Sequence, residues 1–190
     1  AEVKTLKEYG DWVKKNPLQA TFGAVPGTAP HFAGIEYSRA AGLNLQLTPY
    51  KGGNQAVMDL LGGHVPAVIT PVAETQPYHA SGKLRVLATM GAQRSKILPD
   101  IRTMAESGYP QINFLTWTGL FAPAGANNAV VSEINTALKT VLADPNVAAS
   151  IAKLGMEPTP ASPEEFKRLI AADLAFYKKA VAETGFKAED

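Results

Sequence analysis

The sequence of 190 residues contains no cysteine, which excludes thiolate metal sites, redox motifs and disulfides. Charged residues are scarce at 18%, and the formal net charge is only +1, with Lys and Arg scattered along the chain. Neither a nucleic-acid-binding stripe nor a polybasic membrane patch is present. No apolar run approaches the roughly 18 residues that a membrane-spanning helix needs. We therefore expect the partners to be small molecules or proteins.

The usual motifs of cofactor and hydrolase chemistry are also missing. No Gly-Lys-Ser/Thr follows the Gly-rich stretch near the N-terminus, no G-x-G-x-x-G is present, and no serine lies in a G-x-S-x-G context. The three histidines, His31, His64 and His79, have no partner at the spacing of a zinc site. We therefore expect no metal, no cofactor and no catalytic residue.

Hydrophobic residues make up 46% of the chain, and the first half alternates apolar strands with helices. Strands too apolar to face water, each followed by a helix, are typical of a parallel sheet covered on both sides. The sequence thus predicts a doubly wound α/β fold. The expected strands span residues 18–22, 45–48, 65–70 and 84–89, and the expected helices of this half span about 5–15, 30–41, 54–61, 71–80 and 103–108.

The loops that follow these strands are expected to gather at one edge of the sheet, because crossovers between parallel strands are right-handed. The loops span residues 24–30, 50–53, 70–74 and 90–94. In the first loop, Gly27 and Thr28 precede a helix, an arrangement that can present free amide groups to an anion. An ordinary strand-to-helix connection uses the same residue types, so the loop alone leaves both interpretations open.

The composition changes after Gly108. Residues 113–121 are expected to form a long extended stretch, followed by helices over 129–142, 145–154 and 163–184. Asp144 is a suitable N-cap for the second of these helices, and Ser162 with Glu165 forms a capping box for the third. We expect a domain boundary near residues 113–117.

Several motifs occur in an order that resembles the Bug receptors, the extracytoplasmic solute receptors of tripartite tricarboxylate-type transport systems. The similarity runs from about Thr5 onward through nearly the whole chain, and the ordered set is more specific than any single motif. The motifs are Gly-Thr-Ala-Pro-His-Phe-Ala-Gly at 27–34, Pro-Tyr-Lys-Gly-Gly at 49–53, Asp-Leu-Leu-Gly-Gly at 59–63, Gly-Lys-Leu-Arg-Val-Leu-Ala at 82–88 and Ser-Pro-Glu-Glu-Phe at 162–166.

This resemblance implies the type II periplasmic-binding-protein fold, in which two α/β lobes close on a small ligand like a Venus flytrap. Residues 1–114 then correspond to the second lobe, 115–121 to a hinge strand that crosses back, and 122–190 to the helical end of the first lobe. The family's N-terminal part, with most of the first lobe, would be absent from this chain. The resemblance also implies a periplasmic location, with a signal peptide upstream.

Family members hold a ligand carboxylate through backbone amides and hydroxyls. Two departures from the family pattern stand out: Ala24 occupies a position where Ser is usual, and Thr70 one where many relatives have Asp. Since Asp suits an ammonium group, Thr70 predicts a ligand without an amine. The resemblance assigns ligand binding to Ala24, Gly27, Thr28, His31, Tyr50, Lys51, Gly52 and Thr70.

Three of these assignments have structural alternatives. His31 could have a structural or surface role, Lys51 could simply be solvated, and Thr70 could be an N-cap. The expected function is nevertheless that of a non-catalytic receptor, which captures a dicarboxylate or an aromatic carboxylate for the subunits of a membrane transporter. The surface left bare by the absent lobe favours dimerisation.

Two other functions remain open. One is a ligand-sensing effector domain of a regulator, which can have the same fold class. The other is an α/β enzyme domain that acts on a phosphorylated or acyl substrate, for which Glu74, His31 and Lys51 are the available groups.

Overall fold

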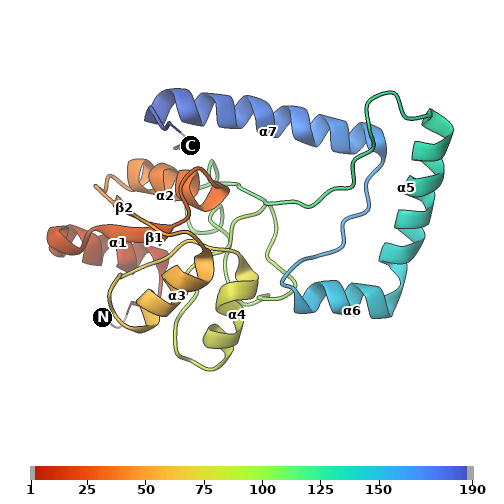
Figure 1. Cartoon of the computed structure of the whole chain (residues 1–190). Helices are drawn as coiled ribbons and strands as arrows, with labels where there is room; N and C mark the ends of the chain where they lie inside the picture. The colour runs from red at the N-terminus through yellow and green to blue at the C-terminus, as the bar shows by residue number, and fades with distance from the viewer. Residues whose placement is uncertain (1–2, 188–190) are drawn as a thin grey trace. The chain divides into compact units, whose positions relative to one another are not determined.

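A computed structural model describes residues 3–187. The chain divides into two compact units, residues 1–116 and residues 117–190, which we call the first and the second unit (Figure 1). None of the helices in the described residues is both long and apolar enough to cross a membrane.

The first unit begins with helix α1 (Leu6–Lys15). The Thr5 hydroxyl accepts a hydrogen bond from the Glu8 amide at 3.1 Å, as an N-cap should, while the Glu8 carboxylate accepts one from the Lys4 amide at 2.7 Å. The helix ends at Asn16, and the 3₁₀ turn η1 (Pro17–Gln19) follows. The expectation of a strand from residue 18 is wrong here, because Pro17 starts this turn and leaves Leu18 98% exposed.

The sheet consists of the parallel strands β1 (Thr21–Ala24) and β2 (Gln46–Pro49), which pair from Thr21 with Gln46 to Ala24 with Pro49. Helix α2 connects them, so the two strands and the helix form one parallel crossover unit. The helices that accompany this sheet in the first unit are α2 (Ala29–Ala40), α3 (Gly53–Leu61) and α4 (Val72–Ala80).

The other two expected strands form only isolated bridges. Val68 bridges to Gly23 beside β1, with the Gly23 amide bonded to the Ala67 carbonyl at 2.9 Å. Pro66 has no amide hydrogen, so the segment 65–70 cannot extend the ladder toward its start. The segment 84–89 bridges at Thr89 to Thr103. The expected helix over 103–108 is also wrong, because the chain makes only turns there before Gly108 adopts a φ of 97°.

The core lies between β1 and the helices of the first unit. Phe22 on β1 is 1% exposed and lies against Gly34 on α2, where a Cβ atom would overlap the ring. This close approach lets the helix pack on the strand and positions the loop between them. Other fully buried or nearly buried side chains are Phe32, Val57, Thr103 and Ile112.

The second unit contains helices α5 (Asn128–Ala143), α6 (Pro145–Lys153) and α7 (Pro163–Thr184). Two sequence predictions are confirmed: Asp144 caps α6, and Ser162 with Glu165 forms the capping box of α7. Residues 113–121 form no strand in the described structure. Instead the Trp117 indole donates to Asp173 at 2.6 Å and meets Phe166 edge-on, so side-chain packing on α7 orders part of this stretch without a ladder.

Candidate functional site

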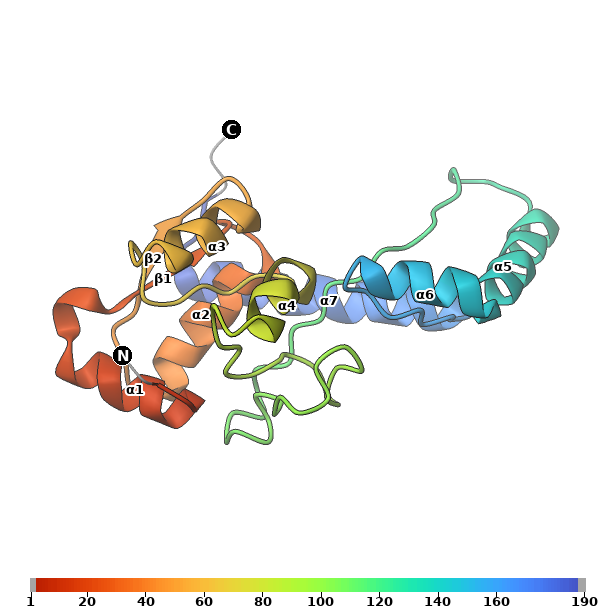
Figure 2. The ribbon, with the colours of Figure 1, turned by 90° about the horizontal axis from the view of Figure 1, so that it is seen from below.

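Backbone hydrogen bonds bring three of the four expected loops to one edge of the sheet. The Tyr50 amide donates to the Ala24 carbonyl at 3.0 Å, and the Ile69 amide donates to the Gly23 carbonyl at 2.9 Å. The segments that follow β1, β2 and residues 65–70 therefore leave the sheet side by side. Figure 2 shows α3, which follows β2, next to the two strands.

The fourth expected loop, residues 90–94, is held differently. The strand segment before it is bonded to residues 102–104, through the Thr89 amide and the Met104 amide. Arg94 pairs with Glu106 at 2.9 Å. No backbone hydrogen bond among the described residues joins this loop to the edge formed by the other three, so we leave it out of the candidate site.

The first loop is organised by His31. This side chain is buried, and its Nδ1 accepts a hydrogen bond from the Gly27 amide at 3.1 Å. Burial lowers the pKa of His31, which favours the neutral ring that such a bond requires. Gly27 adopts a φ of 74°, a conformation that favours glycine. The histidine thus fixes the shape of the loop and engages one of the amides assigned to the ligand.

Thr28 and Ala24 complete the first loop. Thr28 is the N-cap residue of α2 by position, but its side chain makes no cap bond. Its hydroxyl donates instead to the Val25 carbonyl at 2.6 Å, which closes the turn. Ala24 is buried, and its carbonyl accepts the hydrogen bond from the Tyr50 amide. The Thr28 side chain therefore accepts no hydrogen bond from the amides of the first turn of α2.

In the second loop, the Tyr50 ring lies across β1. A Cβ atom at Gly23 would come within 2.8 Å of this ring, so the glycine makes room for it. The Tyr50 hydroxyl donates to Asp59 Oδ2 at 2.8 Å. Burial and this bond raise the pKa of Tyr50 to about 12, while bonds from Tyr50 and His64 lower the pKa of Asp59. The tyrosine is therefore held as a neutral donor.

Lys51 and Gly52 follow at the start of α3. Gly52 is the N-cap residue, whereas Asn54 was expected there and lies inside the helix. Lys51 is exposed, and in the described part of the chain no carboxylate is within ion-pair distance of it. An exposed cation beside a helix N-terminus favours the binding of an anion at this loop.

In the third loop, the Thr70 hydroxyl donates to the carboxylate of Glu74. Pro71, and not Thr70, is the N-cap residue of α4, so the interpretation of Thr70 as a simple N-cap is wrong. Gly53 of the second loop lies against both side chains, because a Cβ atom there would overlap Thr70 and Glu74. The second and third loops are thus in direct contact.

Asp59 and Glu74 are the polar groups of this edge that the sequence analysis did not assign to ligand binding. Asp59 accepts the Tyr50 hydroxyl from nine positions further along the chain, and no local pattern in the sequence indicated this contact. Glu74 was considered solely as a catalytic group. In the described residues, no cluster of three or more His, Asp or Glu side chains could hold a metal ion.

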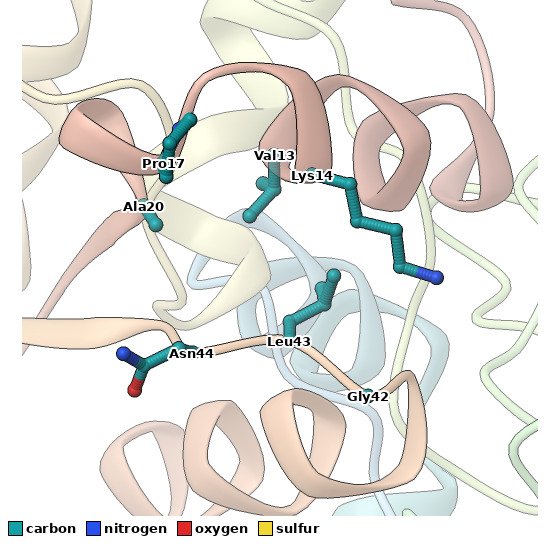
Figure 3. A pocket seen from close by; sticks show the side chains of 7 residues that line it. All are labelled: Val13, Lys14, Pro17, Ala20, Gly42, Leu43 and Asn44. Carbon is teal, nitrogen blue, oxygen red and sulfur yellow. The ribbon is translucent and has the colours of Figure 1, made fainter.

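A separate cavity of about 200 Å³ lies at the opposite end of the strands (Figure 3). Ala20 precedes β1 and Asn44 precedes β2, so this cavity faces the amino ends of the strands, away from the three loops. Lys14 is its one charged lining residue, while Val13 and Leu43 point into it. The sequence analysis did not predict this cavity.

Residues 1–186 match the family described as "Tripartite tricarboxylate transporter family receptor". The chain belongs to this receptor family. The resemblance noted in the sequence, and the parallel α/β fold that it implied, are thereby confirmed.

Individual relatives agree with this membership. The "UPF0065 protein in gbd 5'region" of Cupriavidus necator is 34% identical over 183 residues, which cover 95% of this chain and 55% of that protein. The chain therefore spans about half the length of this curated relative. The structure of the periplasmic binding protein BugD is 29% identical with a TM-score of 0.77, covering all of this chain and 64% of BugD.

A more distant solved structure shows the same fold. The R. palustris protein Rpa4515 with adipate is 24% identical to this chain, with a TM-score of 0.82. The match covers 97% of this chain and 62% of Rpa4515.

Proposed function

We propose that this chain is the ligand-binding part of a periplasmic receptor, which captures a small carboxylate and presents it to a membrane transporter without catalysis. The observation that carries the proposal is the set of backbone bonds that places the loops after β1, β2 and residues 65–70 at one edge. In α/β folds, ligands bind at this carboxyl edge. Family membership supports the receptor role.

The groups at this edge are suited to an anion. The loop before α3 supplies the backbone amides of Lys51 and Gly52 together with the exposed ammonium of Lys51. Helix N-termini favour negative charge, and amide donors bind carboxylates strongly. The proposed ligand-binding residues are Ala24, Gly27, Thr28, His31, Tyr50, Lys51, Gly52 and Thr70.

The absence of catalysis is part of the proposal. His31, the histidine at the edge, uses Nδ1 to accept the Gly27 amide and is buried, so it is poorly placed as a general base. Glu74 is bonded to Thr70. Neither arrangement resembles a nucleophile with an adjacent base.

The proposed ligand class is a dicarboxylate or an aromatic carboxylate. Adipate, the dicarboxylate present with Rpa4515, is a suitable first probe. A ligand at 100 times its dissociation constant stabilises the folded chain by about 2.7 kcal/mol. We expect adipate, succinate or benzoate to raise the midpoint of thermal unfolding in a concentration-dependent way.

Two matched lysine variants make this test specific. Lys51→Ala should weaken the stabilisation, because it removes the cation beside α3, whereas Lys14→Ala at the opposite cavity should leave it unchanged. If no carboxylate shifts the midpoint, or if Lys14→Ala removes the effect and Lys51→Ala does not, the proposed site is wrong.

A further inference from the structure

The position of Glu74 is the starting point for one further inference. Its carboxylate accepts the Thr70 hydroxyl and lies against Gly53, the first residue of α3. A carboxylate therefore occupies the junction of the second and third loops, within the edge assigned to an anionic ligand.

This carboxylate is not neutralised by a neighbouring cation. In the described part of the chain, no Lys, Arg or His is within ion-pair distance of Glu74, and the side chain is half-buried. An ionised carboxylate can accept about four hydrogen bonds, of which the Thr70 hydroxyl supplies one. In this half-buried position the remaining acceptor sites of the carboxylate are open to water or to a donor on a bound ligand.

We propose that Glu74 selects carboxylate ligands that carry a hydrogen-bond donor, a hydroxyl or an ammonium group, close to the bound carboxylate. The inference rests on the proposed function and names the ligand class of the same site. A plain dicarboxylate would bring its charge near Glu74 without compensation, and like charges repel. A donor on the ligand converts this repulsion into a charge-assisted hydrogen bond.

The same geometry changes the interpretation of Thr70. The expectation of a ligand without an amine depended on Thr70 replacing an acidic residue. The structure places an acidic side chain beside Thr70 from one helical turn further along, and Gly53 leaves the space that this carboxylate needs. Glu74 therefore supplies a carboxylate beside residue 70 that can accept a hydrogen bond from a ligand, although Thr70 itself is neutral.

Three ligands that differ at one carbon test the inference: succinate, malate and aspartate, which carry hydrogen, hydroxyl and ammonium at that position. Dissociation constants are measured by calorimetry on the full chain. We expect malate and aspartate to bind more tightly than succinate. The dissociation constant of aspartate should be about tenfold lower than that of succinate, because a hydrogen bond to a charged group is strong enough to change affinity by about that factor. Glu74→Gln should reduce this preference severalfold.

Two further variants serve as controls. Glu133→Gln on α5 makes the same charge change in the second unit and should leave the order of affinities unchanged. Glu74→Asp keeps the carboxylate charge and should still bind malate and aspartate more tightly than succinate. Comparison with Glu74→Gln then distinguishes the effect of the lost charge from a structural effect of the substitution.

The outcomes distinguish the inference from the proposed function. If the native chain binds adipate or benzoate but none of these three ligands, the inference about Glu74 fails and the carboxylate site stands. If the native chain binds no carboxylate at all, the proposed function fails and the inference falls with it. If the native chain binds them and Glu74→Gln shows the same ratios, the carboxylate site stands and the role of Glu74 is overturned. A native preference for succinate overturns that role as well.

Discussion

At the residue scale, the contact between Gly34 and Phe22 determines how α2 packs on β1. A helix-interior glycine normally costs about 0.5–1 kcal/mol relative to alanine, so Gly34→Ala would stabilise an unconstrained helix. Here the new methyl group would overlap the buried Phe22 ring. We expect the substitution to lower the free energy of unfolding by about 1–3 kcal/mol, measured by urea denaturation.

A second substitution identifies the cause of that loss. Phe22→Leu removes the ring atoms that the methyl group would meet. The double variant should therefore lose less stability than the sum of the two single variants. If the stability losses of the two single variants add up to the loss of the double variant, overlap between the new methyl group and the Phe22 ring is not the cause of the loss.

We expect His31 to make the stability of the chain depend on pH. Burial lowers the pKa of His31 below its ordinary value of 6.5, so the unfolded chain binds a proton more readily than the folded chain. The stability contributed by the neutral ring is complete above pH 6.5 and is lost as the pH falls toward the lowered folded-state pKa.

Replacement of His31 tests this dependence. In His31→Asn, the amide oxygen can still accept the Gly27 amide but does not titrate. The free energy of unfolding, measured by urea denaturation from pH 7 to pH 5, should decrease less in the variant than in the native chain. Equal slopes would show that this histidine does not carry the effect.

Single residues at the site were only partly predictable. The Gly27 turn and the start of α2 near Thr28 are local features, so the sequence indicated them. The bonds from Tyr50 to Asp59 and from Thr70 to Glu74 depend on where α3 and α4 lie, and spacing alone did not predict them. The ligand-binding assignments themselves remain predictions.

At the element scale, helix caps stabilise the second unit. The Asp144 carboxylate accepts bonds from the Asn146 and Val147 amides at 2.7 and 3.2 Å. Asp144→Ala should reduce the free energy of unfolding by about 1 kcal/mol, because these amides lose their partner. The helical circular dichroism signal at increasing urea concentration measures the effect.

Asp144→Asn is the matched control for this cap. Asparagine caps helices about as well as aspartate. The control should keep most of the stability, whereas a loss as large as that of the alanine variant would contradict a capping role.

Helices were predicted better than strands for a physical reason. Caps, prolines and apolar periodicity are local, so the limits of α6 and α7 were close to those observed. A strand requires a neighbour with which to form a ladder. Residues 84–89 and 113–121 have the composition of strands, but no ladder forms there in the described residues.

At the scale of the whole molecule, the two units differ in burial. The first unit contains nearly the whole core, whereas Ala180 is the only buried residue among those described in the second unit. Little buried apolar surface implies low local stability. The chain also covers only 55% of a relative and 64% of BugD, so the activity of the complete receptor remains a proposal.

Hydrogen exchange can measure this difference in stability. We expect amides of β1, such as Gly23 with its bond to Ala67, to exchange much more slowly than amides inside α5. Equal protection in the two units would show that the apolar faces of the second unit are covered in solution.

The central claim, that the edge formed by the three loops binds a carboxylate, is tested most directly by amide chemical shifts during titration. Adipate and malate are added to the ¹⁵N-labelled chain, and each backbone amide is followed. The account predicts that the largest shifts lie at residues 24–28, 50–53 and 70, with little change around Lys14 and Asn44 at the opposite cavity. Shifts confined to that cavity, or none at saturating ligand, would contradict it.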